Sequence, residues 1–201
     1  MNDMLDADRP IGLRERKKAR TRAAIREHAL RLFREQGYQA TTVEQIAEAA
    51  EVSPSTFFRY FPTKEDVVLQ DDFDLITVEA FEAQPAGMSV IAAYRGAAAQ
   101  MYNSLSPEEL ARFRESVELT LTIPEVRARA LDEFAQAIDV TAQAIARRTG
   151  RAPDDPAVRN VAGALVGVVM SATMPWSGQP AEDMFERIDA GLAHLEAGLP
   201  L

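Results

Sequence analysis

Apolar residues recur every three to four positions along almost the whole chain, and alternating apolar and polar residues are rare. This period places apolar side chains on one face of an α-helix, whereas a half-buried strand needs a period of two. Proline and glycine interrupt the pattern where helices begin and end. The sequence therefore predicts an all-α fold of about nine helices. They are expected at 13–36, 42–50, 54–61, 63–82, 89–104, 107–122, 125–149, 156–175 and 181–197.

Charge divides this helical chain into two parts. The net charge of the 201 residues is −9, yet residues 1–64 hold 12 Lys and Arg against 9 Asp and Glu, which gives +3. The remaining residues therefore carry −12. A basic N-terminal part joined to an acidic C-terminal part indicates that only the N-terminal part meets a polyanion such as DNA.

Composition narrows the classes of function. The chain has no Cys and only two His, which excludes thiolate and His-rich metal centres. No Ser/His/Asp, metal-spaced carboxylate or phosphate-loop pattern occurs, so we expect no enzyme activity, cofactor or metal. The apolar run after Arg159 is interrupted by polar residues and Pro175, which favours a core helix over membrane contact. Without Cys or a secretory signal, we expect a cytoplasmic protein.

The second and third predicted helices are short, and the three residues between them give the dimensions of a helix-turn-helix. In helical projection, Phe57 and Phe61 share one face and are expected to pack against the preceding helix. Ser55, Thr56 and Arg59 then point away from this core. Such a helix fits the DNA major groove, where Arg and hydroxyl side chains can bind base edges or phosphates. On spacing alone, a solvated helix in an ordinary bundle is the alternative.

The segment around these helices resembles the DNA-binding domain of the tetracycline-repressor-like (TetR) family of regulators. The resemblance rests on the run TTVEQIAEAAEVSPSTFFRYFPTKEDVV, preceded by ALRLFREQGYQA, and covers about residues 14–70. It implies a helix-turn-helix domain at 14–62, a helical ligand-binding and dimerisation domain at 63–201, and a disordered segment at 1–13. The implied function is a repressor that a small-molecule effector releases from an inverted-repeat operator in double-stranded DNA. The alternative is a constitutive or architectural DNA-binding dimer without an effector.

The resemblance also implies which residues contact DNA. Lys64 is expected to bind phosphate at the start of the fourth helix, where free N–H groups favour anions. That helix is expected to run unbroken to about Glu82 and so to transmit effector binding to the DNA. A basic run before the family motif is expected to track phosphates or to enter the minor groove. The full set is Arg14, Arg16, Lys17, Lys18, Arg20, Thr42, Ser53, Ser55, Thr56, Arg59, Tyr60 and Lys64.

Two positions depart from the family pattern. Phe58 stands where Tyr is commoner, so a hydroxyl that could bind DNA is missing there. Glu51 occupies a turn position that is often Gly. If the Glu51 backbone is left-handed, the cost is about 1–2 kcal/mol, and the alternative is a turn of different geometry.

The last two predicted helices carry apolar stripes that indicate a homodimer. The final helix has the 3-4-3-4 spacing of an a/d seam, and the helix before it has two glycines that allow close approach. The resemblance places the dimer interface on these two helices, and the alternative is that both stripes fill the core of one protomer. The expected interface residues are Gly163, Val166, Gly167, Met170, Phe185, Ile188, Leu192 and Leu195.

An effector pocket is expected among the helices of the acidic domain, although aromatic and Met stripes there also fit a plain core. Arg95, which stands among alanines, either anchors an anionic ligand or pairs with an acid on a helix. The patterns Ile-Pro-Glu-Val-Arg-Ala-Arg and Pro-Trp-Ser-Gly resemble a subgroup of the family associated with peptide-derived redox cofactor loci, which implies an acyl-type effector. The candidate ligand residues are Phe73, Ile76, Phe81, Tyr94, Arg95, Met101, Tyr102, Phe113, Phe134, Met170, Met174 and Trp176.

Overall fold

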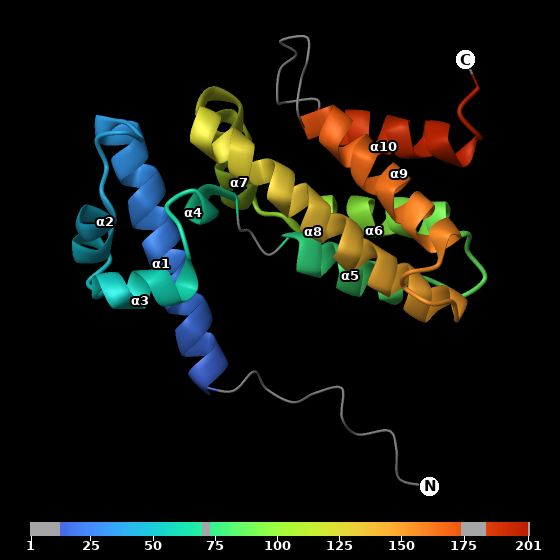
Figure 1. Ribbon diagram of the computed structural model, residues 1–201, viewed down its shortest axis with the longest axis horizontal. Coiled ribbons are helices and arrows are strands. Elements are labelled where there is room, and N and C mark those ends of the chain that lie inside the picture. Colours follow the sequence, from blue (N-terminus) through green and yellow to red (C-terminus); the bar gives the residue numbers. More distant parts are fainter. Residues whose placement is uncertain (1–12, 70–72, 174–183, 201) are drawn as a thin grey trace, which may run out of the picture. The chain divides into compact units, whose positions relative to one another are not determined.

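The computed structural model describes residues 13–69, 73–173 and 184–200, and these residues form helices without any strand (Figure 1). The all-α prediction is confirmed. The chain divides into two compact units, one ending at Val68 and the other beginning at Leu69. The helices in chain order are α1 (Leu13–Gln36), α2 (Val43–Ala49), α3 (Pro54–Tyr60), α4 (Asp66–Leu69), α5 (Phe73–Glu82), α6 (Val90–Ser104), α7 (Pro107–Thr122), α8 (Pro124–Thr149), α9 (Pro156–Thr173) and α10 (Met184–Glu196).

The described residues contain ten helices, of which α4 and α5 both lie within the single helix predicted at 63–82. Thr63 and Asp66 cap each other, so α4 begins only at Asp66. Residues 70–72 between α4 and α5 lie outside the described ranges, as does almost all of the predicted segment 1–13. The continuity of the helix predicted at 63–82 therefore stays a prediction.

The N-terminal unit is built around one side of α1. Ile25 and Ala29 of α1 are fully buried, as is Ile46 of α2. Helix α2 packs against α1, and α3 packs against α2 (Figure 1). Phe57 and Phe61 complete this core with no exposed surface, as the projection of α3 predicted. The segment after α3 hydrogen-bonds back to the loop between α1 and α2, so residues 64 and 65 pack with this unit.

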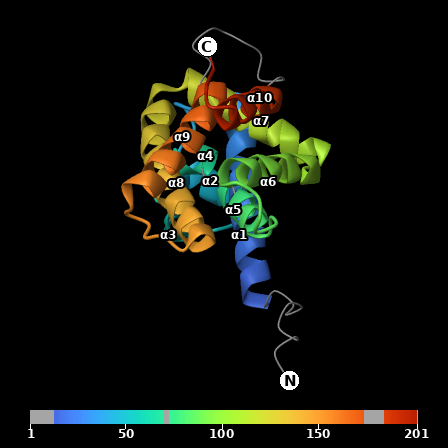
Figure 2. The same ribbon diagram turned by 90° about the vertical axis from the view of Figure 1, so that its right-hand side faces the viewer.

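The C-terminal unit is a bundle in which α8 and α9 lie side by side (Figures 1 and 2). Helix α6 packs against α5 and α10, and α10 also packs against α9. The core contains many alanines, which let the helices approach closely. Helices α9 and α10 approach closely at Gly191 of α10, where an added Cβ would lie 2.6 Å from Cγ1 of Val168.

Candidate functional site

Helix α3 begins with a cluster of three hydroxyl groups. Ser53 is the N-cap residue, and its Oγ accepts a hydrogen bond from the backbone N–H of Thr56 at 3.1 Å. The same Oγ lies 3.0 Å from Oγ1 of Thr56 and 2.9 Å from Oγ of Ser55. Ser53 and Ser55 are exposed, and Pro54 at the first helical position fixes the start of the helix. The cluster therefore presents hydroxyl groups at the N-terminal end of α3, the helix predicted to enter the DNA major groove.

The outer face of α3 carries the side chains expected to meet DNA. Ser55, Phe58 and Arg59 are all exposed and lie three and four positions apart, so they share one face of the helix. The guanidinium of Arg59 lies 5.4 Å from the centre of the Tyr60 ring. Because Phe57 anchors the opposite face in the core, this outer face is held in a fixed orientation.

The turn between α2 and α3 uses a left-handed residue. Glu51 has a φ of 53°, so of the two alternatives for this turn the structure has the left-handed one. The backbone around it is hydrogen-bonded, with the N–H of Val52 donating to the carbonyl of Ala47 at 2.9 Å. A side chain at such a position costs about 1–2 kcal/mol relative to a right-handed backbone. The helix-turn-helix geometry is thus kept although glycine is absent.

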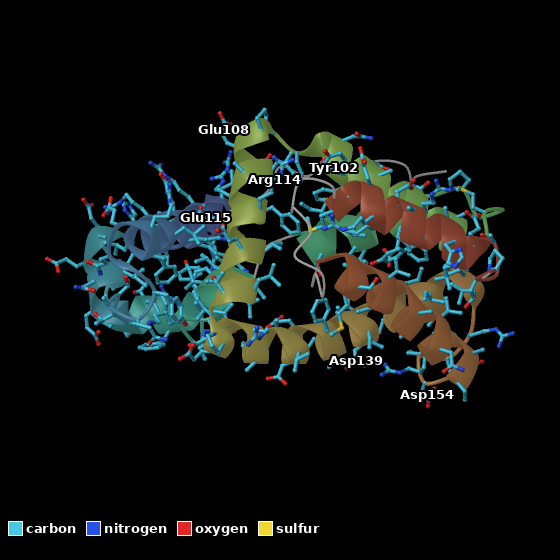
Figure 3. The ribbon with its side chains drawn as sticks, turned by 90° about the horizontal axis from the view of Figure 1, so that it is seen from above. Tyr102, Glu108, Arg114, Glu115, Asp139 and Asp154 are labelled. Carbon is cyan, nitrogen blue, oxygen red and sulfur yellow. The ribbon has the colours of Figure 1, made fainter. Side chains whose placement is uncertain are left out.

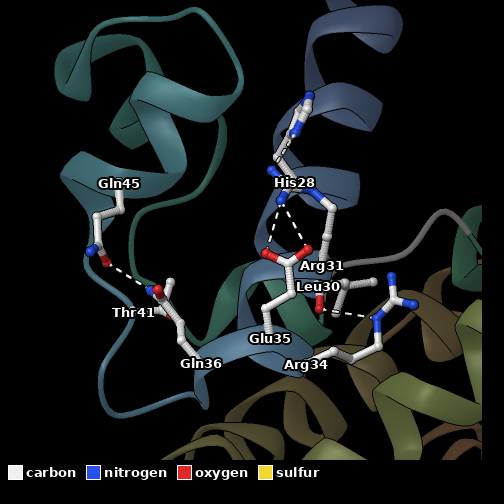
Figure 4. Close-up of polar contacts among 8 residues, drawn as sticks. All are labelled: His28, Leu30, Arg31, Arg34, Glu35, Gln36, Thr41 and Gln45. Carbon is white, nitrogen blue, oxygen red and sulfur yellow. Dashed lines mark hydrogen bonds and ion pairs between the residues drawn. The ribbon is translucent and has the colours of Figure 1, made fainter.

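Side-chain hydrogen bonds tie the start of α2 to the end of α1 (Figure 4). Nε2 of Gln36 donates to Oε1 of Gln45 at 3.0 Å and to Oγ1 of Thr41 at 3.1 Å. Thr42 and Gln45 form a reciprocal capping box at the start of α2. Thr42 is exposed, so its hydroxyl caps the helix and still faces solvent. This bracing fixes the position of α2 and, through α2, that of α3.

Lys64 has an internal role that the sequence did not predict. Its Nζ donates to the backbone carbonyls of Tyr38 at 2.9 Å and Thr41 at 3.0 Å. The same atom lies 3.9 Å from the centre of the Tyr38 ring. The ammonium group thus binds the loop between α1 and α2, whereas the sequence argument placed it at a free helix N-terminus. Its phosphate contact stays a prediction.

The neighbouring carboxylate strengthens this connection. The hydroxyl of Tyr38 donates to Oε1 of Glu65 at 2.7 Å. Partial burial acts to raise the pKa of Glu65, but hydrogen bonds from Tyr38, the Glu65 backbone and Thr63, with the nearby Lys64 charge, lower it overall. Glu65 is therefore held in its ionised form, next to the cation that binds the same loop.

The basic run lies at the beginning of α1, ahead of Ile25, the first buried residue of that helix. An α-helix with its side chains is about 10–12 Å across, whereas the minor groove is about 6 Å wide. Helical residues in this run therefore fit phosphate contacts better than insertion into the minor groove. The exposed cations are Arg14, Arg16, Lys17, Lys18 and Arg20.

Three of the aromatic residues considered for the C-terminal unit form one cluster. The ring of Phe185 in α10 lies 4.1 Å from that of Tyr102 in α6 and 5.6 Å from that of Phe113 in α7, measured between centroids. All three side chains are partly buried. Figure 3 marks Tyr102 and, in the helix that follows, Arg114. Arg114 is half-buried and makes no hydrogen bond or ion pair among the described residues, a feature that sequence reasoning missed.

The other candidate ligand residues are dispersed. Phe81 is buried beneath the Arg148 guanidinium, and Ile76 is exposed. Arg95 is exposed and forms a two-pronged ion pair with Asp189 of α10, so the structure favours the pairing alternative over an anion anchor. The hydrogen bond between them lowers the pKa of Asp189. Tyr94, Phe134 and Met170 are half-buried, Met101 is buried, and the side chain of Phe73 together with Met174 and Trp176 lies outside the described residues.

The two predicted dimer helices differ. The a/d stripe of α10, made of Phe185, Ile188, Leu192 and Leu195, packs against the core of its own protomer. The spacing of an apolar stripe indicates burial but does not say which chain covers it, so the place of these four residues in a dimer interface stays a prediction. In α9, an added Cβ at Gly163 or Gly167 would meet no atom within 4 Å. Val166 is buried and Met170 half-buried.

Helix α9 also passes a length and composition test for a membrane-spanning helix. Its 18 residues have a mean hydropathy of 1.2, and 28% of them are buried inside the described structure. One helix of this kind is weak evidence for a membrane span, because a helix of a soluble bundle can pass the same test. The sequence predicted a core helix here, and one side of α9 is buried in the bundle through Val158, Ala162, Leu165, Val166 and Ala172.

Comparison with known families agrees with these two units. Residues 25–70 match the bacterial regulatory proteins of the tetR family, and residues 88–200 match the MftR C-terminal domain. The chain belongs to the TetR family. It is accordingly a DNA-binding transcriptional regulator, and the helix-turn-helix of α2 and α3 is the element by which this family binds DNA.

Individual relatives resemble different parts of this TetR-family chain. TcmR of Streptomyces glaucescens, a helix-turn-helix transcriptional regulator, is 51% identical over 88 residues, which cover 43% of this chain and 39% of TcmR. The match therefore spans well under half of that relative. MftR of Mycobacterium tuberculosis, named for mycofactocin biosynthesis, is 27% identical over 92% of this chain and 93% of its own length.

Solved structures share the whole fold. The repressor FadR of Thermus thermophilus, crystallised with lauroyl-CoA, has a TM-score of 0.57 at 27% identity and covers 90% of this chain and 95% of its own. A TetR-family regulator of Syntrophomonas wolfei has a TM-score of 0.60 at 18% identity, covering 92% of this chain and 98% of its own. The second similarity supports the fold alone.

Proposed function

We propose that this TetR-family regulator is a repressor that binds an inverted-repeat operator as a homodimer and leaves it when a small-molecule effector binds. The observation that carries the DNA-binding part is the outer face of α3, which presents Ser55 and Arg59 while Phe57 and Phe61 hold the opposite face in the core. A helix of this kind can place Arg against guanine and hydroxyls against bases or phosphates in the major groove.

The remaining contacts are proposed to position the protein without reading sequence. The exposed cations at the start of α1 neutralise phosphates, and the hydroxyls of Thr42 and Ser53 donate to phosphate oxygens at the starts of α2 and α3. Thr56 and Tyr60 are half-buried at the edge of the same surface. In a two-fold symmetric dimer, the two α3 helices reach half-sites about 34–36 Å apart, or a multiple of that distance.

Helix α9 is proposed to form the dimer interface. Its glycines have open space above them within the protomer, and the apolar residues Val168, Val169 and Met170 that follow Gly167 are only partly buried. A second copy of α9 packing there removes apolar surface from water at a close helix approach. Gly167→Glu should therefore convert the dimer to a monomer in sedimentation equilibrium. Ala111→Glu on exposed α7 is the matched control, and equal masses for both variants would contradict this interface.

The effector is proposed to be an acyl-type molecule that binds at the cluster of Tyr102, Phe113 and Phe185. These partly buried rings come from three helices and offer an apolar surface for an acyl chain. Arg114, half-buried and without an internal partner among the described residues, supplies a positive charge for an anionic group of the same ligand. FadR, which shares the fold at 27% identity, was crystallised with lauroyl-CoA, and this supports the choice of ligand class.

DNA binding is tested by selecting duplexes from a randomised library with the purified full-length protein. We expect an inverted repeat, and footprinting should show two protected half-sites with two-fold symmetry. Arg59→Ala should relax the preference at one position in each half-site and cost about 1–3 kcal/mol there, whereas Lys17→Ala should weaken all duplexes alike. Failure to enrich any sequence would contradict a sequence-specific regulator.

Release by an effector is tested by calorimetry with acyl-CoA probes such as lauroyl-CoA. A ligand that lowers operator affinity about a hundredfold must favour the non-binding state by roughly 2.7 kcal/mol, and linkage requires the operator to weaken ligand binding by the same factor. Arg114→Gln should weaken ligand binding and leave operator affinity in the absence of ligand unchanged. Equal ligand affinities with and without saturating operator would leave the constitutive DNA-binding dimer as the function.

A further inference from the structure

Phe58 is an apolar side chain on an otherwise polar surface. It is 50% exposed, and within residues 16–69 it is the only large hydrophobic residue that the structure leaves exposed. Its ring meets that of Phe57 edge-on, at 5.4 Å between centroids and 87° between planes. Phe57 is fully buried, so this contact anchors Phe58 from below and leaves the rest of its ring in solvent.

The position of Phe58 decides what its ring can meet. It lies next to Arg59 and three residues after Ser55, and all three side chains are on the exposed face of α3. When that face enters the major groove, Phe58 meets base edges together with Arg59. A phenyl ring has no hydrogen-bonding group, so any polar base edge that it covers loses water without a compensating bond.

One base offers an apolar group in the major groove, namely thymine with its C5-methyl. We propose that Phe58 is a specificity-determining residue that contacts the C5-methyl of one thymine in each half-site, beside the base that Arg59 contacts. This inference rests on the proposed DNA-binding function and extends it to a defined base and a defined group on that base. The Tyr that is commoner at this position would bring a hydroxyl into the same place, so Phe is suited to a purely apolar contact.

The magnitude follows from the size of the group removed. Transfer of one methyl-sized group out of water is worth about a factor of four in binding. A dimer with two equivalent contacts should therefore lose about fifteenfold in affinity when both methyl groups are absent, by the same conversion. Deoxyuridine is the probe for this test, because it lacks the methyl group and keeps every hydrogen-bonding atom of thymidine.

The experiment uses the full-length protein and the duplex of highest affinity from the library selection. Each thymidine is replaced in turn by deoxyuridine, in both half-sites together, and affinity is measured by fluorescence anisotropy. For the wild-type protein, one symmetric pair of replacements should weaken binding about fifteenfold. Phe58→Ala should bind the unmodified duplex more weakly, and the same replacement should then have no further effect.

A second arm restores the methyl group on another base. At the sensitive position, a 5-methylcytosine·guanine pair should bind the wild-type protein more tightly than a cytosine·guanine pair, and Phe58→Ala should not distinguish them. Leu131→Ala, which removes an exposed apolar side chain from α8, is the control and should keep the wild-type response to deoxyuridine. Unchanged melting temperatures for both variants exclude loss of folding as the cause.

The outcomes separate this inference from the proposed function. If no duplex is enriched, the proposed function itself fails. If a duplex is enriched but no deoxyuridine replacement affects wild-type binding more than Phe58→Ala binding, DNA recognition stands and the thymine contact is overturned. The second result is expected if the ring packs on deoxyribose, because a sugar contact does not depend on the thymine methyl.

Discussion

Replacing Lys64 with Met should destabilise the N-terminal unit, and any loss of DNA binding should follow from that loss of stability. Met keeps most of the aliphatic stem of lysine but removes the charge and all three donors. The carbonyls of Tyr38 and Thr41 then lose the Nζ donor that lies 2.9 and 3.0 Å away. Both residues are buried, at 7% and 1% exposed, so water can replace that donor only in part.

The structure sets the size of this effect. A hydrogen bond from a charged donor is worth about 1.5–3 kcal/mol, and a cation–π contact at an exposed site about 0.5–1 kcal/mol. Lys64 is only half-buried, so the lower end of these ranges applies, which leaves about 2–3 kcal/mol for Lys64→Met. The loop between α1 and α2 should open more often, so operator affinity should fall as a consequence of unfolding.

The assay combines hydrogen exchange of peptides from residues 38–52 with operator binding at several salt concentrations. Lys17→Met is the matched control, because it removes one exposed cation of α1. Lys64→Met should speed hydrogen exchange in the loop, and the operator affinity of the protein that remains folded should depend on salt as in the wild type. Lys17→Met should leave hydrogen exchange unchanged and make operator affinity less dependent on salt. Unchanged exchange with a reduced salt dependence for Lys64→Met would refute the internal role and favour a phosphate contact.

Two further predictions concern the turn and the C-terminal unit. Glu51→Gly should raise the free energy of unfolding in urea by about 0.5–1 kcal/mol. Relief of the left-handed backbone at φ of +53° is worth about 1–2 kcal/mol, and the greater freedom of glycine in the unfolded chain offsets part of this gain. The hydrogen bond from Arg95 lowers the pKa of Asp189 in the folded protein. The ion pair therefore makes its full contribution to folding stability above the ordinary Asp pKa of about 3.9, and this contribution is lost as the pH falls below that value. Because the pair is exposed, Asp189→Asn should lower the free energy of unfolding by less than about 1 kcal/mol at pH 6 and should not change it near pH 2. An equal loss of stability at both pH values would contradict a stabilising ion pair.

The local features of the DNA-binding surface were predictable from the sequence. The inward position of Phe57 follows from helical spacing, and the place of Glu51 in the turn made a left-handed backbone one of two alternatives. Both depend on residues only a few positions away, so a short stretch of sequence contains the information. The hydroxyl cluster at Ser53 is local in the same sense, because an N-cap and its partner are three residues apart.

The features that the sequence did not predict depend on distant parts of the chain. Lys64 binds the carbonyl of Tyr38, which lies 26 positions earlier, and Arg95 pairs with Asp189, which lies 94 positions later. A backbone carbonyl is an acceptor at every position, so no residue type marks it in advance. In the same way, the spacing of Phe185 predicts a buried face but cannot say whether its own protomer or a second copy covers it.

The salt dependence of operator binding tests the proposed DNA contacts of the N-terminal unit most directly. The logarithm of the association constant should fall linearly with the logarithm of salt concentration, with a slope of about −0.9 for each phosphate contacted. A variant with glutamine at Arg14, Arg16, Lys17, Lys18 and Arg20 should bind the operator more weakly, and its slope should be shallower by about 0.9 for each phosphate that it no longer neutralises. A wild-type slope near zero, or equal slopes for the two proteins, would contradict a basic helix that binds DNA.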